Sequence, residues 1–209
     1  MVRSVRSLET APHGSVLIQT GDCLDILPTI DADSIDAVIT SPPYGMPLAR
    51  VLRALHRVLV PDGTCWVLLD DAPIDTEGWT GHHSVSLTEP VSFGGWTLGD
   101  VTDVGTDERL YRLHPTDQPS RYVAAPLDLT HDDRVVSDLY APMSSALVTH
   151  CLTTSTCLGD LVLDPFCGIG TTGRVCSEWG RSFVGIDIDP MRVGLANAYI
   201  ARSVTRVMV

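Results

Sequence analysis

The sequence contains no lysine, so its 14 positively charged side chains are all arginine, against 26 acidic residues and a formal net charge of −12. Phosphate contacts need cations, so this balance counts against a nucleic-acid partner unless the arginines cluster on one face. No run of about 18 consecutive apolar residues occurs, and we therefore expect no membrane-spanning helix. Two arginines near the start precede no apolar stretch, which argues against a signal peptide.

Cysteine pairing also has little support in the sequence. None of the six cysteines forms a Cys-x-x-Cys pair, and neither His82-His83 nor His150-Cys151 has partners at metal-ligand spacing. We therefore predict buried free thiols in a reducing compartment, with no disulfides and no metal site.

What is present is an alternation of apolar runs and helical periodicity. Apolar residues between 48 and 59 recur at helical spacing, and Arg50, Arg53 and Arg57 fall on the other face, which predicts an amphipathic helix. The other predicted elements are strands at 16–20, 37–40, 65–69, 161–163 and 182–186, a helical turn at 24–27, a turn at 61–63, and helices at 142–156 and 190–204, the last capped by Asp189. Strands that alternate with helices predict an α/β fold with a mostly parallel sheet and helices on both faces.

The stretch 71–139 has a different texture, with weak periodicity and many Asp, Gly, Thr and Pro residues. It holds four arginines against thirteen acidic residues, a balance of 4 − 13 = −9. Segments 109–114 and 121–125 are candidates for a pair of strands. We interpret the chain 1–209 as one domain that consists of two halves, 15–70 and 140–209, and this insert.

A glycine-rich loop joins the strand that ends at Asp164 to the next helix. Gly168, Gly170 and Gly173 allow a tight turn and close approach of a ligand to the backbone, and Asp187 ends the following strand, where a carboxylate can accept hydrogen bonds from ribose hydroxyls. Alone, this spacing also fits a dinucleotide site or a simple tight turn. Asp164 would repel a pyrophosphate, whereas it would attract a cofactor that carries an ammonium and a sulfonium.

The tetrad Ser41-Pro42-Pro43-Tyr44 follows directly on a buried strand. An exocyclic amine of a base is a poor nucleophile because its lone pair is delocalised, and two acceptors on the amino hydrogens localise that pair. The Ser41 hydroxyl and the Pro42 carbonyl can be those acceptors, and Tyr44 offers a flat face for an extruded base. The plainer alternative is a proline-rich strand exit with a packed tyrosine. If the two strands are neighbours, tetrad and glycine loop open into one crevice.

At these residues the chain resembles the N4-cytosine and N6-adenine DNA methyltransferases of the beta arrangement, in which the catalytic tetrad precedes the cofactor loop. The resemblance covers 16–70 and 140–205. It is carried by Gly21-Asp22, Thr40 to Gly45, Arg57 to Gly63, Gly159 to Phe166 and Gly185 to Asp187.

The resemblance implies a circularly permuted Rossmann-like fold with S-adenosyl-L-methionine as the methyl donor. It implies a catalytic half at 15–70, a cofactor half at 140–209 and target recognition within 71–139. Asp187 would hold the ribose, Asp22 would lie near the adenine, and the segment around Pro142-Met143-Ser144 would bind the methionine end. Relatives often have a His-Pro or Lys-Pro pair before the cofactor loop, whereas Tyr140-Ala141-Pro142-Met143 stands in that place here. The expected cofactor-binding residues are Asp22, Asp164, Phe166, Gly168, Gly170, Thr171 and Asp187.

A serine at the head of the tetrad is commoner in enzymes that methylate N4 of cytosine. We therefore predict methylation of a flipped cytosine in DNA, with Ser41, Pro42, Pro43 and Tyr44 as catalytic residues, in the cytoplasm of a prokaryote or a phage-infected host. The alternatives are adenine N6 as acceptor, a non-catalytic cofactor- or protein-binding relative, and methylation of RNA or a protein amide. The short insert raises the prospect of help from a second subunit in a homodimer, and a cognate restriction endonuclease is a further candidate partner.

Overall fold

The computed structural model describes residues 14–70, 91–93, 95–104, 108–115, 121–123, 125, 127 and 143–207. Its centre is an eight-stranded sheet in the order β1-β8-β7-β2-β3-β6-β5-β4. The strands are β1 (Val16–Thr20), β2 (Ile35–Thr40), β3 (Leu59–Asp70), β4 (Val91–Phe93), β5 (Trp96–Asp103), β6 (Glu108–Pro115), β7 (Leu161–Asp164) and β8 (Ser182–Asp187). The helices are α1 (Cys23–Ile26), α2 (Ala49–Val58), α3 (Ser145–Ser155), α4 (Thr171–Glu178) and α5 (Pro190–Val207), with a short 3-10 turn at Leu27–Thr29.

The order of the strands differs from their order in the sequence. From β1 to β3 all neighbours pair in parallel, whereas β6, β5 and β4 extend the sheet by antiparallel pairing. β7 lies between β8 and β2 although more than a hundred residues separate it from β2 in the chain. The mostly parallel, permuted α/β fold predicted from the sequence is confirmed, and the strand before the tetrad is a direct neighbour of the strand before the glycine loop.

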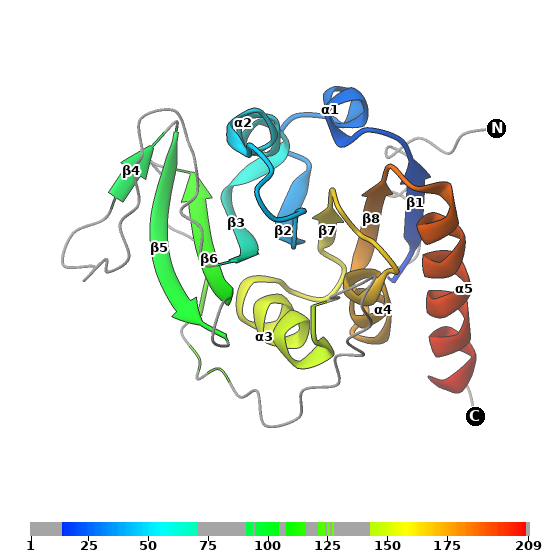
Figure 1. Ribbon diagram of the computed structural model, residues 1–209. Coiled ribbons are helices and arrows are strands. Elements are labelled where there is room, and N and C mark those ends of the chain that lie inside the picture. The colour runs from blue at the N-terminus through cyan, green and yellow to red at the C-terminus, as the bar shows by residue number, and fades with distance from the viewer. Residues whose placement is uncertain are drawn as a thin grey trace.

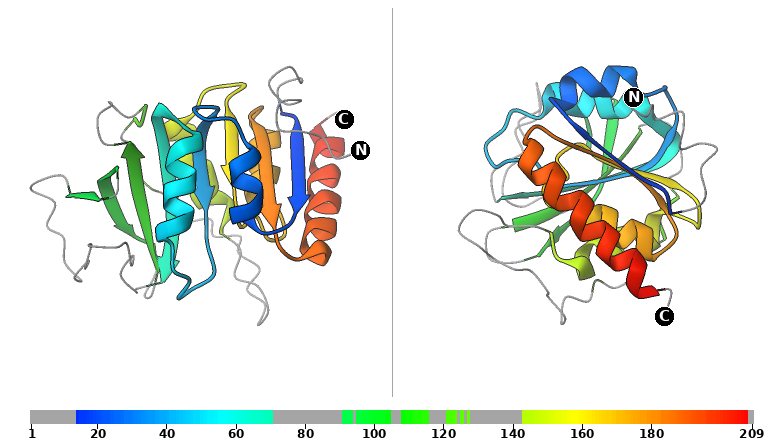
Figure 2. Two further views of the ribbon diagram at one scale, coloured as in Figure 1. Left: turned by 90° about the horizontal axis from the view of Figure 1, so that it is seen from above. Right: turned by 90° about the vertical axis from the view of Figure 1, so that its right-hand side faces the viewer.

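Helices cover both faces of this sheet. Figures 1 and 2 show α1 and α2 on one face and α3, α4 and α5 on the other. Within the described residues, no helix is both long and apolar enough to cross a membrane.

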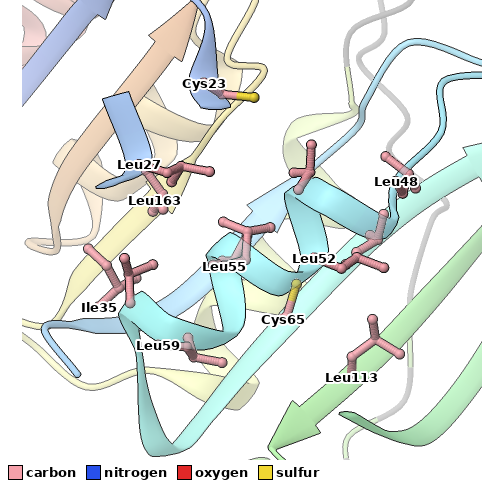
Figure 3. Close-up of a cluster of buried hydrophobic side chains, with 14 of the residues drawn as sticks. Cys23, Leu27, Ile35, Leu48, Leu52, Leu55, Leu59, Cys65, Leu113 and Leu163 are labelled. Carbon is pink, nitrogen blue, oxygen red and sulfur yellow. The ribbon is translucent and has the colours of Figure 1, made fainter. Parts of the chain in front are cut away.

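The amphipathic helix predicted at 48–59 is present as α2. Its apolar side packs on the sheet through Val51, Leu52, Leu55 and Val58, each at most 3% exposed. Figure 3 shows Leu52 and Leu55 in one cluster with Cys65 of β3 and Leu163 of β7. Burial of such side chains contributes about 1.5–3 kcal/mol each, so α2 is held firmly against the sheet.

Two sequence predictions about irregular segments are wrong. The predicted turn at 61–63 lies within β3, where the register against β2 shifts between Ile35 and Ala37 and accommodates the extra residues. The predicted strand at 121–125 is not a strand in its described residues. Arg121 instead forms ion pairs with Asp36 of β2 at 2.7 Å and with Asp62 of β3 at 2.6 Å, which attach this irregular segment to two neighbouring strands.

Smaller differences concern the helix after the insert and one cysteine. The helix predicted from Pro142 begins at Ser145, because the Ser144 side chain accepts a hydrogen bond from Leu147 N and caps it. Pro142, like His82-His83, lies outside the described residues. Of the six cysteines, five are buried and free as predicted, whereas Cys157 is exposed.

Candidate active site

A pocket of about 530 Å³ opens at the carboxyl ends of the parallel strands. Four segments line it: 21–23 after β1, 41–44 after β2, 164–169 after β7, and 187–188 after β8. Ligands of open α/β sheets bind at this edge because the loops that leave neighbouring strands converge there. The sequence predicted that the tetrad and the glycine loop share a crevice, and the structure brings them together in this one.

A buried hydrogen bond joins the two loops at their bases. Thr40, the last residue of β2, donates from Oγ1 to Oδ1 of Asp164 at 2.7 Å, across 124 positions of sequence. Thr40 is 2% exposed and Asp164 is 3% exposed. The bond exists because β2 and β7 are paired neighbours that end together, and it fixes the tetrad relative to the glycine loop.

The Asp164 carboxylate is the most heavily engaged group in the pocket. Besides the Thr40 bond, it accepts hydrogen bonds from Phe166 N at 3.1 Å and from Thr172 Oγ1 at 2.9 Å. Burial nevertheless raises the pKa of Asp164 to about 6, because desolvation outweighs the three donors and Asp187 adds a second negative charge nearby. Near neutral pH this carboxylate therefore carries a charge that a bound cation can compensate.

The glycine loop is organised by Asp187. Its carboxylate accepts from Gly168 N and from Asp189 N, both at 2.9 Å, which joins the loop after β7 to the loop after β8. Gly168 has φ of +52°, and a Cβ built there would meet nothing within 4 Å, so the backbone faces open space in the pocket. A ligand can therefore approach this backbone closely.

Gly170 serves the loop in a different way from Gly168. It does not line the pocket. It precedes α4 with φ of +87°, and a Cβ there would come within 2.9 Å of Ala196 Cβ on α5. Glycine is required here by backbone conformation and helix packing, not by space for a ligand.

The tetrad forms the other wall of the pocket. Pro42 is buried, whereas Tyr44 is 50% exposed and presents its ring at the mouth. The Tyr44 hydroxyl donates to Glu108 Oε1 of β6 at 2.5 Å. An exposed aromatic ring held at a pocket mouth is suited to stacking on a flat ligand.

All but one of the predicted site residues line this single pocket, the exception being Gly170. Those that do are Ser41, Pro42, Pro43, Tyr44, Asp22, Asp164, Phe166, Gly168, Thr171 and Asp187. Asp22 also caps α1, since its Oδ1 accepts from Leu24 N at 2.8 Å. Met143, which the resemblance assigned to the methionine end, is buried and lines the pocket as well.

Sequence reasoning missed several further lining residues, among them Met46, Ile188 and Arg192. Met46 follows the tetrad, Ile188 follows Asp187 and is 71% exposed, and Arg192 lies in the first turn of α5. The only available signal was position, because a residue just beyond a strand end or in the next helical turn faces the same edge. Cys167 also lines the pocket, but burial and the nearby Asp164 carboxylate raise the pKa of its thiol, which makes it a poor nucleophile.

Comparison with known proteins adds sequence and structural relatives. A family model described as DNA methylase, N6_N4_Mtase, matches residues 112–198. The chain is 24% identical to Type II methyltransferase M.Cfr9I of Citrobacter freundii, over 88% of this chain and 87% of the relative. It is 26% identical to DNA adenine methyltransferase YhdJ of Escherichia coli K12, over 90% of this chain and 85% of the relative.

Solved structures share the fold. Protein TTHA0409 of Thermus thermophilus, in complex with S-adenosyl-L-methionine, is similar with a TM-score of 0.61 and 22% identity over 89% of this chain and 93% of that one. The PvuII DNA methyltransferase, described as cytosine-N4-specific, has a TM-score of 0.61 and 16% identity over 95% of each chain. Together with the pocket that unites the tetrad and the glycine loop, the sequence matches support a member of the N4-cytosine/N6-adenine DNA methyltransferase family.

Proposed function

We propose that this protein transfers a methyl group from S-adenosyl-L-methionine to N4 of cytosine in DNA. The observation that carries the proposal is the shared pocket, in which Ser41 at the head of the tetrad faces the same space as Asp164 and the glycine loop. Donor and acceptor sites in one cavity are what a direct group transfer requires, because the reacting atoms must approach within about 3–3.5 Å.

The pocket residues fit this cofactor. When bound, it supplies an electrophilic methyl group on a sulfonium. Asp164 and Asp187 place two carboxylates at the inner end of the pocket, which favours a cationic ligand, and the open backbone at Gly168 leaves room for it. In this proposal Asp187 accepts hydrogen bonds from the ribose hydroxyls, and Asp22 and Ile188 line the same pocket.

The tetrad prepares the acceptor amine. The Ser41 hydroxyl and the Pro42 carbonyl accept hydrogen bonds from the amino group and localise its lone pair on nitrogen. Tyr44 stacks on the flipped base and keeps it at the mouth of the pocket. No covalent intermediate with the protein is required, so positioning and electrostatics supply the catalysis.

Cytosine is favoured over adenine by the serine at position 41. The competing candidate is adenine N6, and the observation on its side is the similarity to YhdJ, which is described as a DNA adenine methyltransferase. A homodimer and a cognate endonuclease of a restriction-modification pair stay predictions.

The test is incubation of the purified protein with GC-rich genomic DNA and isotopically labelled cofactor, followed by digestion and mass spectrometry of the nucleosides. We expect labelled N4-methyldeoxycytidine. Ser41→Ala and Tyr44→Ala should each lower transfer by about 100-fold and leave cofactor binding within a few-fold of wild type. Labelled N6-methyldeoxyadenosine would replace cytosine by adenine as the target, and cofactor binding without any labelled DNA would favour a non-catalytic relative.

A further inference from the structure

The arginines of this acidic chain are unevenly placed. No acidic residue occurs between Asp36 and Asp62, a stretch that begins before the tetrad and includes all of α2. The same stretch holds Arg50, Arg53 and Arg57. In a chain of net charge −12, the stretch that contains the tetrad and α2 therefore carries three positive side chains and no negative one.

The three arginines lie on one face of α2. Their spacing of three and four residues puts them on a single stripe of a helix, and all three are exposed. The opposite side of α2 is buried against the sheet (Figure 3). The stripe is therefore presented outward on the face of the molecule that α1 and α2 cover (Figure 2).

Arginines elsewhere in the described residues are mostly used within the fold. Five of them lie within 4 Å of a carboxylate oxygen, namely Arg109, Arg112, Arg121, Arg174 and Arg192. On α2, Arg57 donates to the carbonyls of Leu27 and Ile30, both at 2.7 Å, and so helps to hold the 3-10 turn. Arg50 forms no ion pair within the described part of the chain. Arg53, one turn further along, is exposed as well, although it also makes an interaction within the protein.

Of the three arginines on α2, Arg50 lies at the end of the helix that is nearest to the pocket. β2 ends at the pocket edge, the tetrad follows, and α2 then begins at Ala49 and runs back toward the other edge. Arg50 is thus in the first turn, close in sequence to Tyr44, and Arg53 follows about 4.5 Å along the helix axis. A base that enters this pocket from a duplex leaves its flanking phosphates outside, next to the pocket mouth.

We propose that Arg50 and Arg53 form the surface of this protein that contacts the DNA backbone beside the flipped nucleotide. The inference rests on the proposed function and adds where an acidic chain meets a polyanion. It predicts that affinity for DNA depends on salt through these two side chains, since each phosphate neutralised contributes about −0.9 to the slope of log K against log salt.

The experiment compares wild type with Arg50→Gln/Arg53→Gln, measuring KM for DNA, affinity for a fluorescent duplex at several NaCl concentrations, and cofactor affinity by calorimetry. We expect KM and Kd for DNA to rise by roughly 10-fold to 100-fold and the salt slope to fall in magnitude by about 1.8. Cofactor affinity should stay at the wild-type value. Arg202→Gln, which removes an exposed arginine from α5 on the other face of the sheet, is the matched control and should alter none of these quantities.

Two failures are distinguishable. If wild type transfers no methyl group to DNA, the proposed function is wrong. If wild type transfers it and the double variant keeps the wild-type KM and salt slope, or changes no more than the Arg202→Gln control, the arginine surface is wrong and the proposed function stands.

Discussion

Thr40 and Asp164 end two neighbouring strands and are joined by a buried hydrogen bond of 2.7 Å. Thr40→Val keeps the shape of the side chain and removes the donor. A buried hydrogen bond to a charged group contributes about 1.5–3 kcal/mol, and its loss disfavours the ionised carboxylate. We therefore expect weaker binding of S-adenosyl-L-methionine at pH 7.5, by roughly 10-fold, as measured by calorimetry.

The control for this substitution is Thr153→Val on α3. Thr153 is an exposed helical threonine. Within the described residues its hydroxyl bonds only to carbonyls of its own helix, Thr149 at 2.8 Å and His150 at 3.4 Å. Thr153→Val makes the same chemical change far from the pocket, so we expect the affinity for the cofactor to stay at the wild-type value. Equal affinities of the Thr40 and Thr153 variants would show that the bond between the two loops has no role in cofactor binding.

The pKa of Asp164 gives cofactor binding a pH dependence. Because burial raises that pKa to about 6, the carboxyl group is ionised above that value and becomes neutral below it. Affinity for the cationic cofactor should be constant above about pH 7 and fall as pH decreases through 6, by at most about tenfold per pH unit. Asp164→Asn should bind weakly and lose this dependence. A wild-type profile that is flat from pH 5 to 8 would contradict the assignment.

The same carboxyl group changes the stability of the cofactor-free protein in the opposite sense. Its pKa is higher in the folded chain than the ordinary value of 3.8, so the native state binds the proton more tightly. Its contribution to the free energy of unfolding is therefore greatest at low pH, falls as pH rises between about 4 and 6, and is level above that range. Urea unfolding of wild type and Asp164→Asn across this range isolates the contribution as the difference between the two.

Much of the parallel part of the sheet could be predicted from the sequence, for a physical reason. Strands such as β2 and β7 are covered on both faces, so they read as short apolar runs, and each ends at a residue that cannot continue the pattern. The pocket lies at those ends, so the tetrad and the glycine loop could each be predicted from the sequence, because each directly follows a predicted strand. Their proximity itself came only from the pairing of β2 with β7.

The antiparallel extension was harder to predict. β5 has the sequence WTLGDVTD. Its last five residues, which begin with Gly99, are partly buried or exposed, so the strand lacks an apolar run. The segment after β6 has β-forming residues at 121–123. Arg121, however, forms ion pairs with three carboxylates, those of Asp36, Asp62 and Asp160. Arg192 was missed because a single arginine in a helix carries no pattern. For Arg121, contacts between segments far apart in the sequence decided the outcome.

Gly170 and Gly194 offer a matched pair of glycine substitutions. Gly170→Ala puts a side chain at φ of +87° and against Ala196, so we expect a loss of about 1–3 kcal/mol in stability together with weaker cofactor binding. Gly194 lies within α5, and a Cβ there meets nothing within 4 Å. Gly194→Ala should therefore stabilise the protein by about 0.5–1 kcal/mol. Chemical denaturation measures both, and two alanine variants of equal stability would contradict the assigned conformational role of Gly170.

The hydrogen bond from Tyr44 to Glu108 connects the tetrad to the antiparallel extension of the sheet. It gives the tetrad tyrosine an anchor that a phenylalanine would lack, because stacking needs only the ring whereas the position of the ring depends on the hydroxyl. Removing the bond by Tyr44→Phe or by Glu108→Ala should lower kcat/KM for DNA by about 2-fold to 10-fold. The affinity for the cofactor should not change, since Glu108 lies outside the pocket lining.

Non-additivity separates this bond from unrelated effects of the two substitutions. If Tyr44 and Glu108 act through one hydrogen bond, the double variant Tyr44→Phe/Glu108→Ala should be no slower than the slower single variant. Glu108→Gln keeps an acceptor oxygen and should recover much of the activity. Tyr199→Phe, which alters an exposed tyrosine on α5, serves as the control. Additive losses in the double variant would mean that the two residues contribute independently, and the ring of Tyr44 would then owe its position to the tetrad backbone alone.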